Sequence, residues 1–207
     1  MSGSNEEKKV LLAGLPNSGL STIKAIIDNN PPKELKPIIQ KLNIGNSLKD
    51  LLHGRLFLIR CGGNESINDL LSPTNDPLFK NVEALVYILD LAEQANYSIA
   101  RYWFEAIKNH IHKFSPNARI FIFLHKTDLL EGNKLTNYIS AAKNLFNEGD
   151  TEIYFHETSV YDASIFMAFR DVLLKEMDEK ISVKQYFSQA LKDSNFACLA
   201  VFSKDGL

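Results

Sequence analysis

Residues 9–22, KVLLAGLPNSGLST, decide the fold of this chain. Residues 9–13 form a short apolar run, which is typical of a buried strand. A glycine-rich turn follows, and residues 21–28 then form a helical stretch that stops before Asn29-Asn30-Pro31-Pro32. This order of strand, glycine-rich turn and helix predicts a loop that can present backbone N–H groups to an anion.

Outward from this stretch, apolar runs alternate with helical patterns. Strands are predicted at residues 55–60 (RLFLIR), 84–90 (ALVYILD), 119–124 (RIFIFL) and 153–155. Helices are predicted at residues 95–114, 135–146, 165–177 and 183–191. Residues 33–54 are compatible with either a strand or a helix. Near-continuous apolar strands between helices indicate an α/β fold with three layers, in which a mainly parallel central sheet is covered on both faces.

The chain has 207 residues, of which 45% are hydrophobic and 23% charged, and its formal net charge is −2. This length suits one domain, with or without a small appendage, and the charge argues against nucleic acid as the main partner. No apolar run reaches the roughly 20 residues that a membrane-spanning helix needs. Residues 1–8 are expected to be a disordered leader without a lipid-anchor motif. Cys61 and Cys198 make no disulfide framework, so a cytoplasmic setting is expected.

The glycine-rich turn follows the phosphate-loop template G-x-x-x-x-G-K-[ST] except at the lysine. Gly14, Gly19 and Ser21 match, whereas Leu20 occupies the lysine position. The lysine normally brings a cation to the β- and γ-phosphates. Losing one charge-assisted contact weakens binding by roughly 1.5–3 kcal/mol. The alternative interpretation is a plain strand–turn–helix corner that binds no ligand.

If the loop does bind a nucleotide, Ser21 keeps a hydroxyl that suits Mg²⁺. It is the one candidate metal ligand. The candidate nucleotide-binding residues of the loop are Gly14, Asn17, Ser18, Gly19, Leu20, Ser21 and Thr22.

GTP-hydrolysing loops are normally completed by D-x-x-G and a glutamine, which hold Mg²⁺, the γ-phosphate and the attacking water. Here residues 60–64 are Arg-Cys-Gly-Gly-Asn. Gly63 persists, but Arg60 stands at the position of the acid and Asn64 at that of the glutamine. An arginine can restore some positive charge but cannot bind a metal. Gly63 and Asn64 are therefore the only candidates at catalytic positions, and neither is assigned a catalytic role.

The segment that should close over Mg²⁺ and the γ-phosphate also lacks its usual residue. Between Asn29 and Arg60 there is no threonine, and Ser47 is the only hydroxyl. These losses all fall on the metal, phosphate and water side of the predicted site. They argue against Mg²⁺ binding and against GTP hydrolysis.

The base-reading side is better preserved. Residues 125–128 are His-Lys-Thr-Asp, where guanine-binding proteins carry N-K-x-D. The Asp128 carboxylate can accept hydrogen bonds from the guanine N1 and N2 groups, and the Lys126 stem can cover the ring. His125 replaces the asparagine that braces neighbouring loops. Ser159 and Val160 follow the last predicted strand, at the position of a backbone amide that meets the guanine O6.

The histidine before Lys-x-Asp is the specific feature, because the Rag (Gtr) GTPases carry H-K-x-D there. The chain resembles this family over nearly its whole length. Residues 61–63 match the family's D-C-G-G-Q motif after its first residue, and residues 79–90 resemble its fourth-strand segment. Residues 158–162 (TSVYD) are similar to its T-S-I-[WY]-D box, and residues 197–207 resemble the first strand of its C-terminal roadblock domain.

The resemblance implies a small-GTPase-like P-loop fold and a cytoplasmic switch. Rag proteins dimerise through roadblock domains and relay amino-acid sufficiency to the target-of-rapamycin kinase complex at lysosomes. The resemblance therefore implies a Rag-like partner subunit bound through the C-terminal region. It also implies regulatory proteins on the switch face, the side that carries the segment expected to close over Mg²⁺ and the γ-phosphate. Recruitment to an endolysosomal membrane would come through partners. We expect a leader at residues 1–8, a Rag-like domain at 9–178, and a C-terminal helix with the start of a roadblock domain at 179–207.

Two functional hypotheses follow. The first is a pseudo-GTPase subunit that regulates or scaffolds a heterodimer, with weak or absent hydrolysis. The replacements at Leu20, Arg60 and Asn64 motivate it. The second is a switch that binds GTP or GDP with low intrinsic turnover, which the retained Lys126 and Asp128 motivate.

Overall fold

The computed structural model describes residues 9–42, 52, 55–62, 66–147 and 151–174. Its sheet contains five strands in the order β2-β1-β3-β4-β5. All four pairings between neighbouring strands are parallel. The mainly parallel sheet predicted from the sequence is therefore confirmed. The strands are β1 (Lys9–Gly14), β2 (Leu56–Arg60), β3 (Val82–Asp90), β4 (Arg119–His125) and β5 (Ile153–Thr158).

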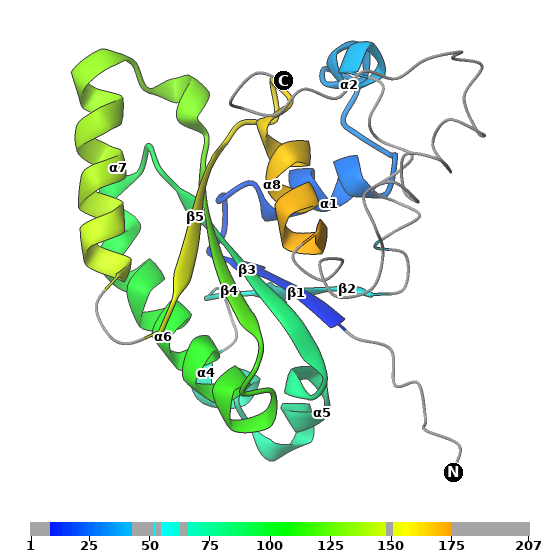
Figure 1. Ribbon diagram of the computed structural model, residues 1–207, viewed down its shortest axis with the longest axis vertical. Helices are drawn as coiled ribbons and strands as arrows, with labels where there is room; N and C mark the ends of the chain where they lie inside the picture. Colours follow the sequence, from blue (N-terminus) through cyan, green and yellow to red (C-terminus); the bar gives the residue numbers. More distant parts are fainter. Residues whose placement is uncertain (1–8, 43–51, 53–54, 63–65, 148–150, 175–207) are drawn as a thin grey trace, which may run out of the picture. The chain divides into compact units, whose positions relative to one another are not determined.

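Helices cover both faces of the sheet (Figure 1). One face carries α6 (Tyr97–Phe114) and α7 (Gly132–Phe146), whose residues share a buried cluster with β3 and β4. The opposite face carries α1 (Leu20–Ile27) and the start of α8 (Ser164–Leu174), where Phe169 contacts Phe123 of β4. This is the three-layer α/β arrangement expected of apolar parallel strands, because both faces must be removed from water.

The core on the α6 side is aromatic. Tyr87 of β3, Phe104 of α6 and Phe146 of α7 are fully buried, with centroids 5.4 Å apart for Tyr87 and Phe104 and 5.3 Å apart for Phe104 and Phe146. The Tyr87 hydroxyl donates a hydrogen bond of 2.8 Å to the Ala100 carbonyl, so its polar end is satisfied. These contacts fix α6 and α7 against the sheet whose strand ends carry the candidate site.

The structure adds elements that the sequence patterns did not predict. Part of the ambiguous segment is helical, as α2 (Lys36–Leu42). Between β2 and β3 the chain forms three short elements, α4 (Ile67–Leu70), η1 (Pro73–Asn75) and α5 (Asp76–Phe79), and two further 3-10 turns are η2 (Gln94–Asn96) and η3 (Thr127–Leu129). A capping box at Ser66 and Asp69 begins α4. These pieces are too short for periodicity to mark them.

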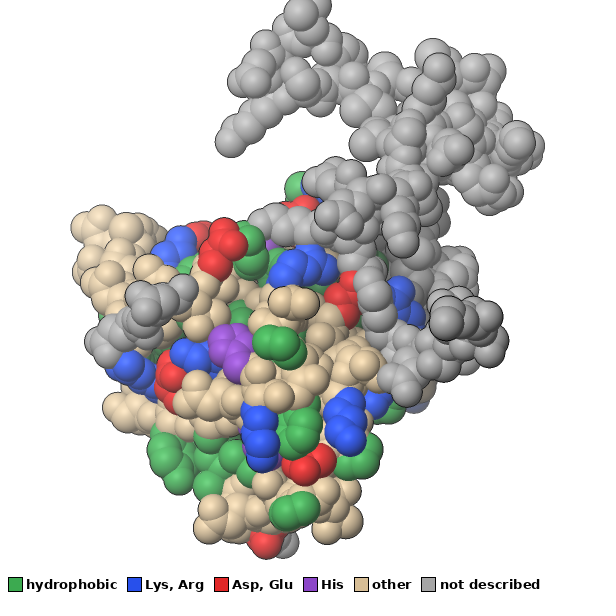
Figure 2. Space-filling model, turned by 60° about the horizontal axis from the view of Figure 1, so that its bottom comes forward, with side chains coloured by type: hydrophobic (Ala, Val, Ile, Leu, Met, Phe, Trp, Pro, Cys, Tyr) green, Lys and Arg blue, Asp and Glu red, His purple; other side chains and the backbone are tan. Residues whose placement is uncertain are grey.

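The chain divides into two compact units, residues 1–169 and 170–207. The helix predicted at 183–191 and the strand at 197–207 lie outside the described residues, so the predicted domain boundary stays a prediction. Among the described helices, none is long and apolar enough to cross a bilayer. On the face that Figure 2 draws, acidic and basic side chains are interspersed across the described part of the chain.

Candidate functional site

The candidate residues converge because parallel strands end at the same edge of the sheet. The register pairs Gly14 of β1 with Ile88 of β3. It also pairs Asp90 of β3 with His125 of β4, and His125 with Thr158 of β5. The loops that follow these strands therefore lie next to one another. Open parallel sheets generally bind ligands at this edge.

The phosphate loop has the backbone of an anion-binding turn. Asn17 and Gly19 adopt left-handed conformations, with φ of 65° and 97°. Within the described part of the chain, no hydrogen-bond acceptor is recorded for the backbone N–H groups of Asn17, Gly19, Leu20 and Ser21. The last two lie in the first turn of α1, where the positive end of the helix dipole adds to them. The loop can therefore offer a cluster of N–H donors to phosphate oxygens.

The side chain at the lysine position, Leu20, does not take part in anion binding. Leu20 is only 5% exposed and belongs to the buried side of α1. Ser18 is also buried, whereas Ser21 is exposed and Thr22 is half-buried. Gly14 sits where an added Cβ would meet the Ser18 Oγ at 2.7 Å and the Ile88 carbonyl at 2.9 Å. The loop is thus closely packed from behind but carries no side-chain cation of its own.

His125 joins the phosphate loop to the base-reading side. Its Nδ1 lies 3.0 Å from the Thr158 Oγ1, in a hydrogen bond between β4 and β5. Its ring lies so close to Gly19 that an added Cβ there would meet the Cδ2 at 2.6 Å. Burial lowers the pKa of His125 to about 4, so the imidazole is neutral at physiological pH. It serves as a buried brace, the role expected of the asparagine that it replaces.

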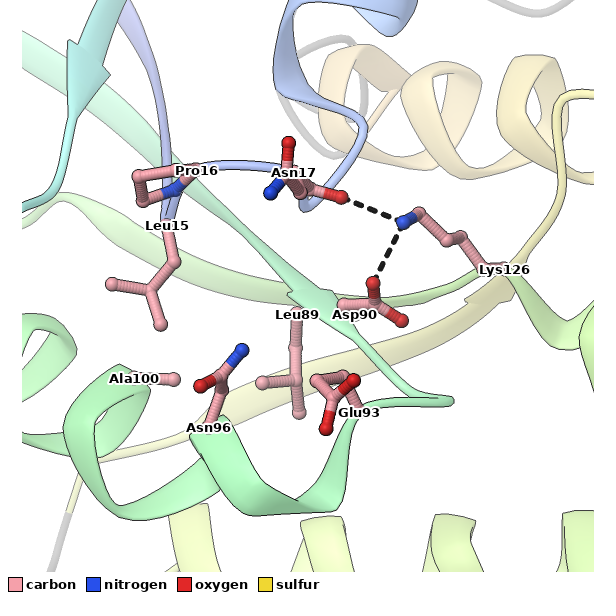
Figure 3. Close-up of a pocket in the computed structure, with 9 residues that line it drawn as sticks. All are labelled: Leu15, Pro16, Asn17, Leu89, Asp90, Glu93, Asn96, Ala100 and Lys126. Carbon is pink, nitrogen blue, oxygen red and sulfur yellow. Dashed lines mark hydrogen bonds and ion pairs between the residues drawn. The ribbon is translucent and has the colours of Figure 1, made fainter. Parts of the chain in front are cut away.

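Lys126 ties two strand-end loops together, as Figure 3 shows. It adopts a left-handed conformation with φ of 64°. Its Nζ donates hydrogen bonds of 2.6 Å to the Asn17 carbonyl and 2.7 Å to the Asp90 Oδ2. The ammonium is therefore already engaged by the Asn17 carbonyl and the Asp90 carboxylate. A pocket of about 270 Å³ adjoins this link, lined by Leu15, Pro16, Asn17, Leu89, Asp90, Glu93, Asn96, Ala100 and Lys126.

Asp128 is exposed but held in place. The Ser159 Oγ donates a hydrogen bond of 2.6 Å to the Asp128 Oδ1. The same Oγ accepts a hydrogen bond of 3.0 Å from the Tyr161 N–H. One carboxylate oxygen of Asp128 is thus fixed by Ser159, while the other has no recorded partner among the described residues. This arrangement suits a carboxylate that must accept hydrogen bonds from a base.

The side of the site that would hold a metal and the attacking water has few suitable residues. Arg60 ends β2 next to Gly14 in the strand register, and its side chain is exposed. Gly63 and Asn64 lie outside the described residues. Among the residues that are described, no group of three or more His, Cys, Asp or Glu side chains could hold a metal ion. Burial raises the pKa of the Cys61 thiol to about 12, which leaves it unsuited to nucleophilic chemistry.

Sequence reasoning missed three residues that the structure brings to the site. Asp90 holds Lys126, Thr158 holds His125, and the Ser164 Oγ accepts a hydrogen bond of 2.8 Å from the Ser159 N–H. Asp90 and Thr158 stand at the ends of predicted strands, so their position was an available signal. Ser164 begins a helix five residues beyond Ser159, and no pattern in the sequence marks it.

The parallel sheet, the loop after β1 and the residues at the ends of β4 and β5 define a P-loop fold of the small-GTPase type. The model of the Gtr1/RagA G protein conserved region matches residues 9–206. The chain therefore belongs to the Gtr1/RagA family.

Individual relatives are similar at low identity. The chain is 27% identical over 178 residues to the GTP-binding protein GTR1 of Saccharomyces cerevisiae, covering 82% of this chain and 57% of that protein. It is 26% identical over 202 residues to gtr1 of Schizosaccharomyces pombe, covering 95% and 65%. It is 26% identical over 181 residues to Ras-related GTP-binding protein C of Homo sapiens, covering 83% and 44%. The chain thus spans less than two thirds of the length of each.

Proposed function

We propose that this chain is a Rag-like pseudo-GTPase subunit, which regulates or scaffolds a heterodimeric nutrient-signalling complex with weak or absent GTP hydrolysis. The observation that carries the proposal is Leu20. It fills the position of the phosphate-loop lysine with a buried, uncharged side chain. A transferring phosphoryl group develops charge that fixed cations and metal ions must stabilise. A loop without that cation can hold a phosphate but stabilises the transition state poorly.

Family membership supports the partner part of the proposal. In the resemblance described above, Rag proteins pair through C-terminal roadblock domains. A partner subunit would then supply the active nucleotide switch, while this chain provides a docking surface and directs regulatory proteins to the switch face. Any placement at an endolysosomal membrane would come through those partners.

Hydrolysis by the wild-type chain and by a restored variant tests the proposal. The variant Leu20→Lys/Arg60→Asp/Asn64→Gln returns the cation, the metal-binding acid and the water-orienting amide together. We expect the wild-type protein to release phosphate from GTP at the background rate, and the triple variant to exceed it. Leu20→Met/Arg60→Lys/Asn64→Ser is the matched control, because it changes the same positions without restoring those groups. Turnover by the wild-type protein at the rate of an active small GTPase would overturn the proposal.

A second candidate function, a GTP- or GDP-binding switch of low turnover, is favoured by the base-reading side. Asp128 is held by Ser159, Lys126 is held by Asn17 and Asp90, and the loop presents N–H groups that have no acceptor among the described residues. These residues fit the guanine and one or two phosphates of a nucleotide. Among the described residues, Ser21 is the one candidate ligand for Mg²⁺, so nucleotide binding should depend little on the metal.

Released nucleotide separates the two candidates. Purified protein is denatured and the supernatant is chromatographed for GTP and GDP. Near-stoichiometric nucleotide that is lost in Asp128→Ala supports the switch. Empty protein that shows no saturable binding at high micromolar GTP or GDP removes the switch and leaves the pseudo-GTPase.

A further inference from the structure

The loop between β5 and α8 is held by a continuous series of hydrogen bonds. Asp162 Oδ1 accepts a hydrogen bond of 2.8 Å from the Ser164 N–H and a second, short one from the Ser164 Oγ. The Ser164 Oγ in turn accepts a hydrogen bond of 2.8 Å from the Ser159 N–H. Ser159 then donates through its own Oγ to the Asp128 carboxylate. The first turn of α8 is thereby connected to the residue that would read a guanine base.

The burial of these residues shows where the series is anchored. Ser159 is 1% exposed, Ser164 is half-buried, and Asp162 and Asp128 are exposed at the two ends. Among the described residues, the Ser159 N–H bonds with the Ser164 Oγ alone, and the Ser159 Oγ bonds with Asp128 and with the Tyr161 N–H. If Ser164 lost its hydroxyl, the buried Ser159 N–H would have no acceptor among the described residues. An unsatisfied buried donor is destabilising, so the loop would move to recover a partner.

The series also leaves one donor free. Val160 lies between Ser159 and Tyr161, and its backbone N–H has no recorded acceptor within the part of the chain that is described. The bonds to Ser159 and Tyr161 fix the backbone on both sides of this N–H. A guanine carries a carbonyl acceptor at O6 and donors at N1 and N2. The free Val160 N–H and the Asp128 carboxylate match that pattern of acceptor and donors.

We propose that Ser164, held by Asp162, is a positioning residue that sets the guanine selectivity of this site. It acts through Ser159 on two groups at once, the Asp128 carboxylate and the Val160 N–H. Side chains that contact a ligand discriminate well only when a supporting set of hydrogen bonds holds them in place. This inference rests on the second candidate function, in which the site binds a guanine nucleotide.

Competition between GDP and inosine diphosphate tests the inference, because inosine lacks the 2-amino group that Asp128 can accept from. Affinities are measured by displacement of a fluorescent GDP analogue from the whole chain. Ser164→Ala should weaken GDP binding about tenfold, which corresponds to about 1.4 kcal/mol. It should also lower the preference for GDP, measured as the ratio of the dissociation constants of inosine diphosphate and GDP, by at least about threefold. Asp162→Ala should do the same to a smaller extent, and Ser164→Thr, which keeps the hydroxyl, should restore both values.

Two controls separate positioning from a loss of folding. Thr136→Ala removes an exposed hydroxyl of α7 whose recorded hydrogen bond is to the Gly132 carbonyl of its own helix. It should leave both affinities unchanged. In an Asp128→Ala background, titrated directly with GDP and inosine diphosphate at concentrations high enough to measure the weakened binding, Ser164→Ala should cause no further narrowing of the GDP preference, because the group through which it acts is gone.

The outcomes are distinguishable. A lower unfolding temperature for Ser164→Ala with an unchanged GDP preference would show a purely structural serine and overturn the inference alone. The full narrowing in the Asp128→Ala background would overturn the proposed route through Asp128. A wild-type protein that binds neither nucleotide overturns the second candidate function and this inference together, before any variant is made.

Discussion

Two side chains, Leu20 and His125, set the character of the candidate site at the scale of the residue. Leu20 is buried where a cation would meet phosphate, and His125 is a buried neutral imidazole where an amide would brace the loops. The first change removes charge from the ligand side. The second keeps a structural link by different chemistry, which makes that link sensitive to acid. Each has a direct test.

Restoring the cation should strengthen phosphate binding. Leu20→Lys places an ammonium on the first residue of α1, and we expect GTP and GDP to bind about ten- to a hundredfold more tightly, given roughly 1.5–3 kcal/mol for a charge-assisted contact. Leu20→Met keeps an apolar side chain and should leave the affinity unchanged. Isothermal titration calorimetry measures both variants. An equal change in Leu20→Lys and Leu20→Met would mean that packing, and not charge, governs binding here.

Protonation of His125 should destabilise the fold in mild acid. The folded-state pKa is lowered to about 4 from an ordinary value of about 6.5, because the imidazole is buried. The unfolded chain therefore binds a proton first as pH falls below about 6.5, and stability is lost progressively down to pH 4. Between pH 7.5 and pH 5 the loss amounts to about 2 kcal/mol from this residue. His125→Asn removes the titrating group and can keep the bond to Thr158.

Urea unfolding of the two proteins at both pH values isolates this effect. The wild-type free energy of unfolding should fall more than that of His125→Asn, by about 2 kcal/mol. Other titrating groups contribute equally to both proteins and cancel in the difference. Identical pH dependence in the two proteins would contradict the role given to His125.

At the scale of the element, the phosphate loop depends on the shape of its backbone. Gly19 combines a φ of 97° with the His125 ring against its Cα, so it has neither the conformation nor the space for a side chain. Gly132, at the start of α7, also has a positive φ, of 52°, but nothing lies within 4 Å of an added Cβ. The two glycines therefore separate conformational strain from steric exclusion.

Gly19→Ala should destabilise the protein more than Gly132→Ala. Strain alone in the left-handed region costs about 1–2 kcal/mol, which is the expected effect at Gly132. At Gly19 the clash with His125 adds to that strain and displaces the loop, so any nucleotide affinity should fall as well. Thermal unfolding and nucleotide titration measure the two effects. Equal destabilisation by both variants would mean that the His125 ring moves aside at no cost.

At the scale of the whole molecule, the sheet and its helices hold the strand ends in register. Phe146 is fully buried against Phe104 and Tyr87, so Phe146→Ala should leave a cavity and cost about 3–5 kcal/mol. Met167 on α8 is 53% exposed, and Met167→Ala should change stability by no more than about 0.5 kcal/mol. Urea unfolding at neutral pH compares them. A small effect at Phe146 would show that α7 is dispensable for the sheet.

The sequence by itself determined the order of the strands along the chain and the glycine-rich turn, and it predicted which residues would read a base. These are local signals, since apolar runs mark buried strands and glycines mark turns. They also revealed the replacement at Leu20, because a template compares residues position by position. The short helices between β2 and β3 could not be predicted from the sequence, because elements of three or four residues carry no measurable hydrophobic period.

Only the tertiary structure decided how the side chains of separate loops meet. Lys126 donates a hydrogen bond to Asn17, which is 109 positions away along the chain. His125 bonds with Thr158 on the neighbouring strand, and its ring lies close to Gly19. Ser164 reaches Ser159 because α8 begins close to the end of β5. No local pattern encodes such contacts, because they depend on the parallel register that brings distant strand ends to one edge of the sheet. The residue types indicated which chemistry the candidate site could support. The parallel sheet brought those residues within hydrogen-bonding distance of one another.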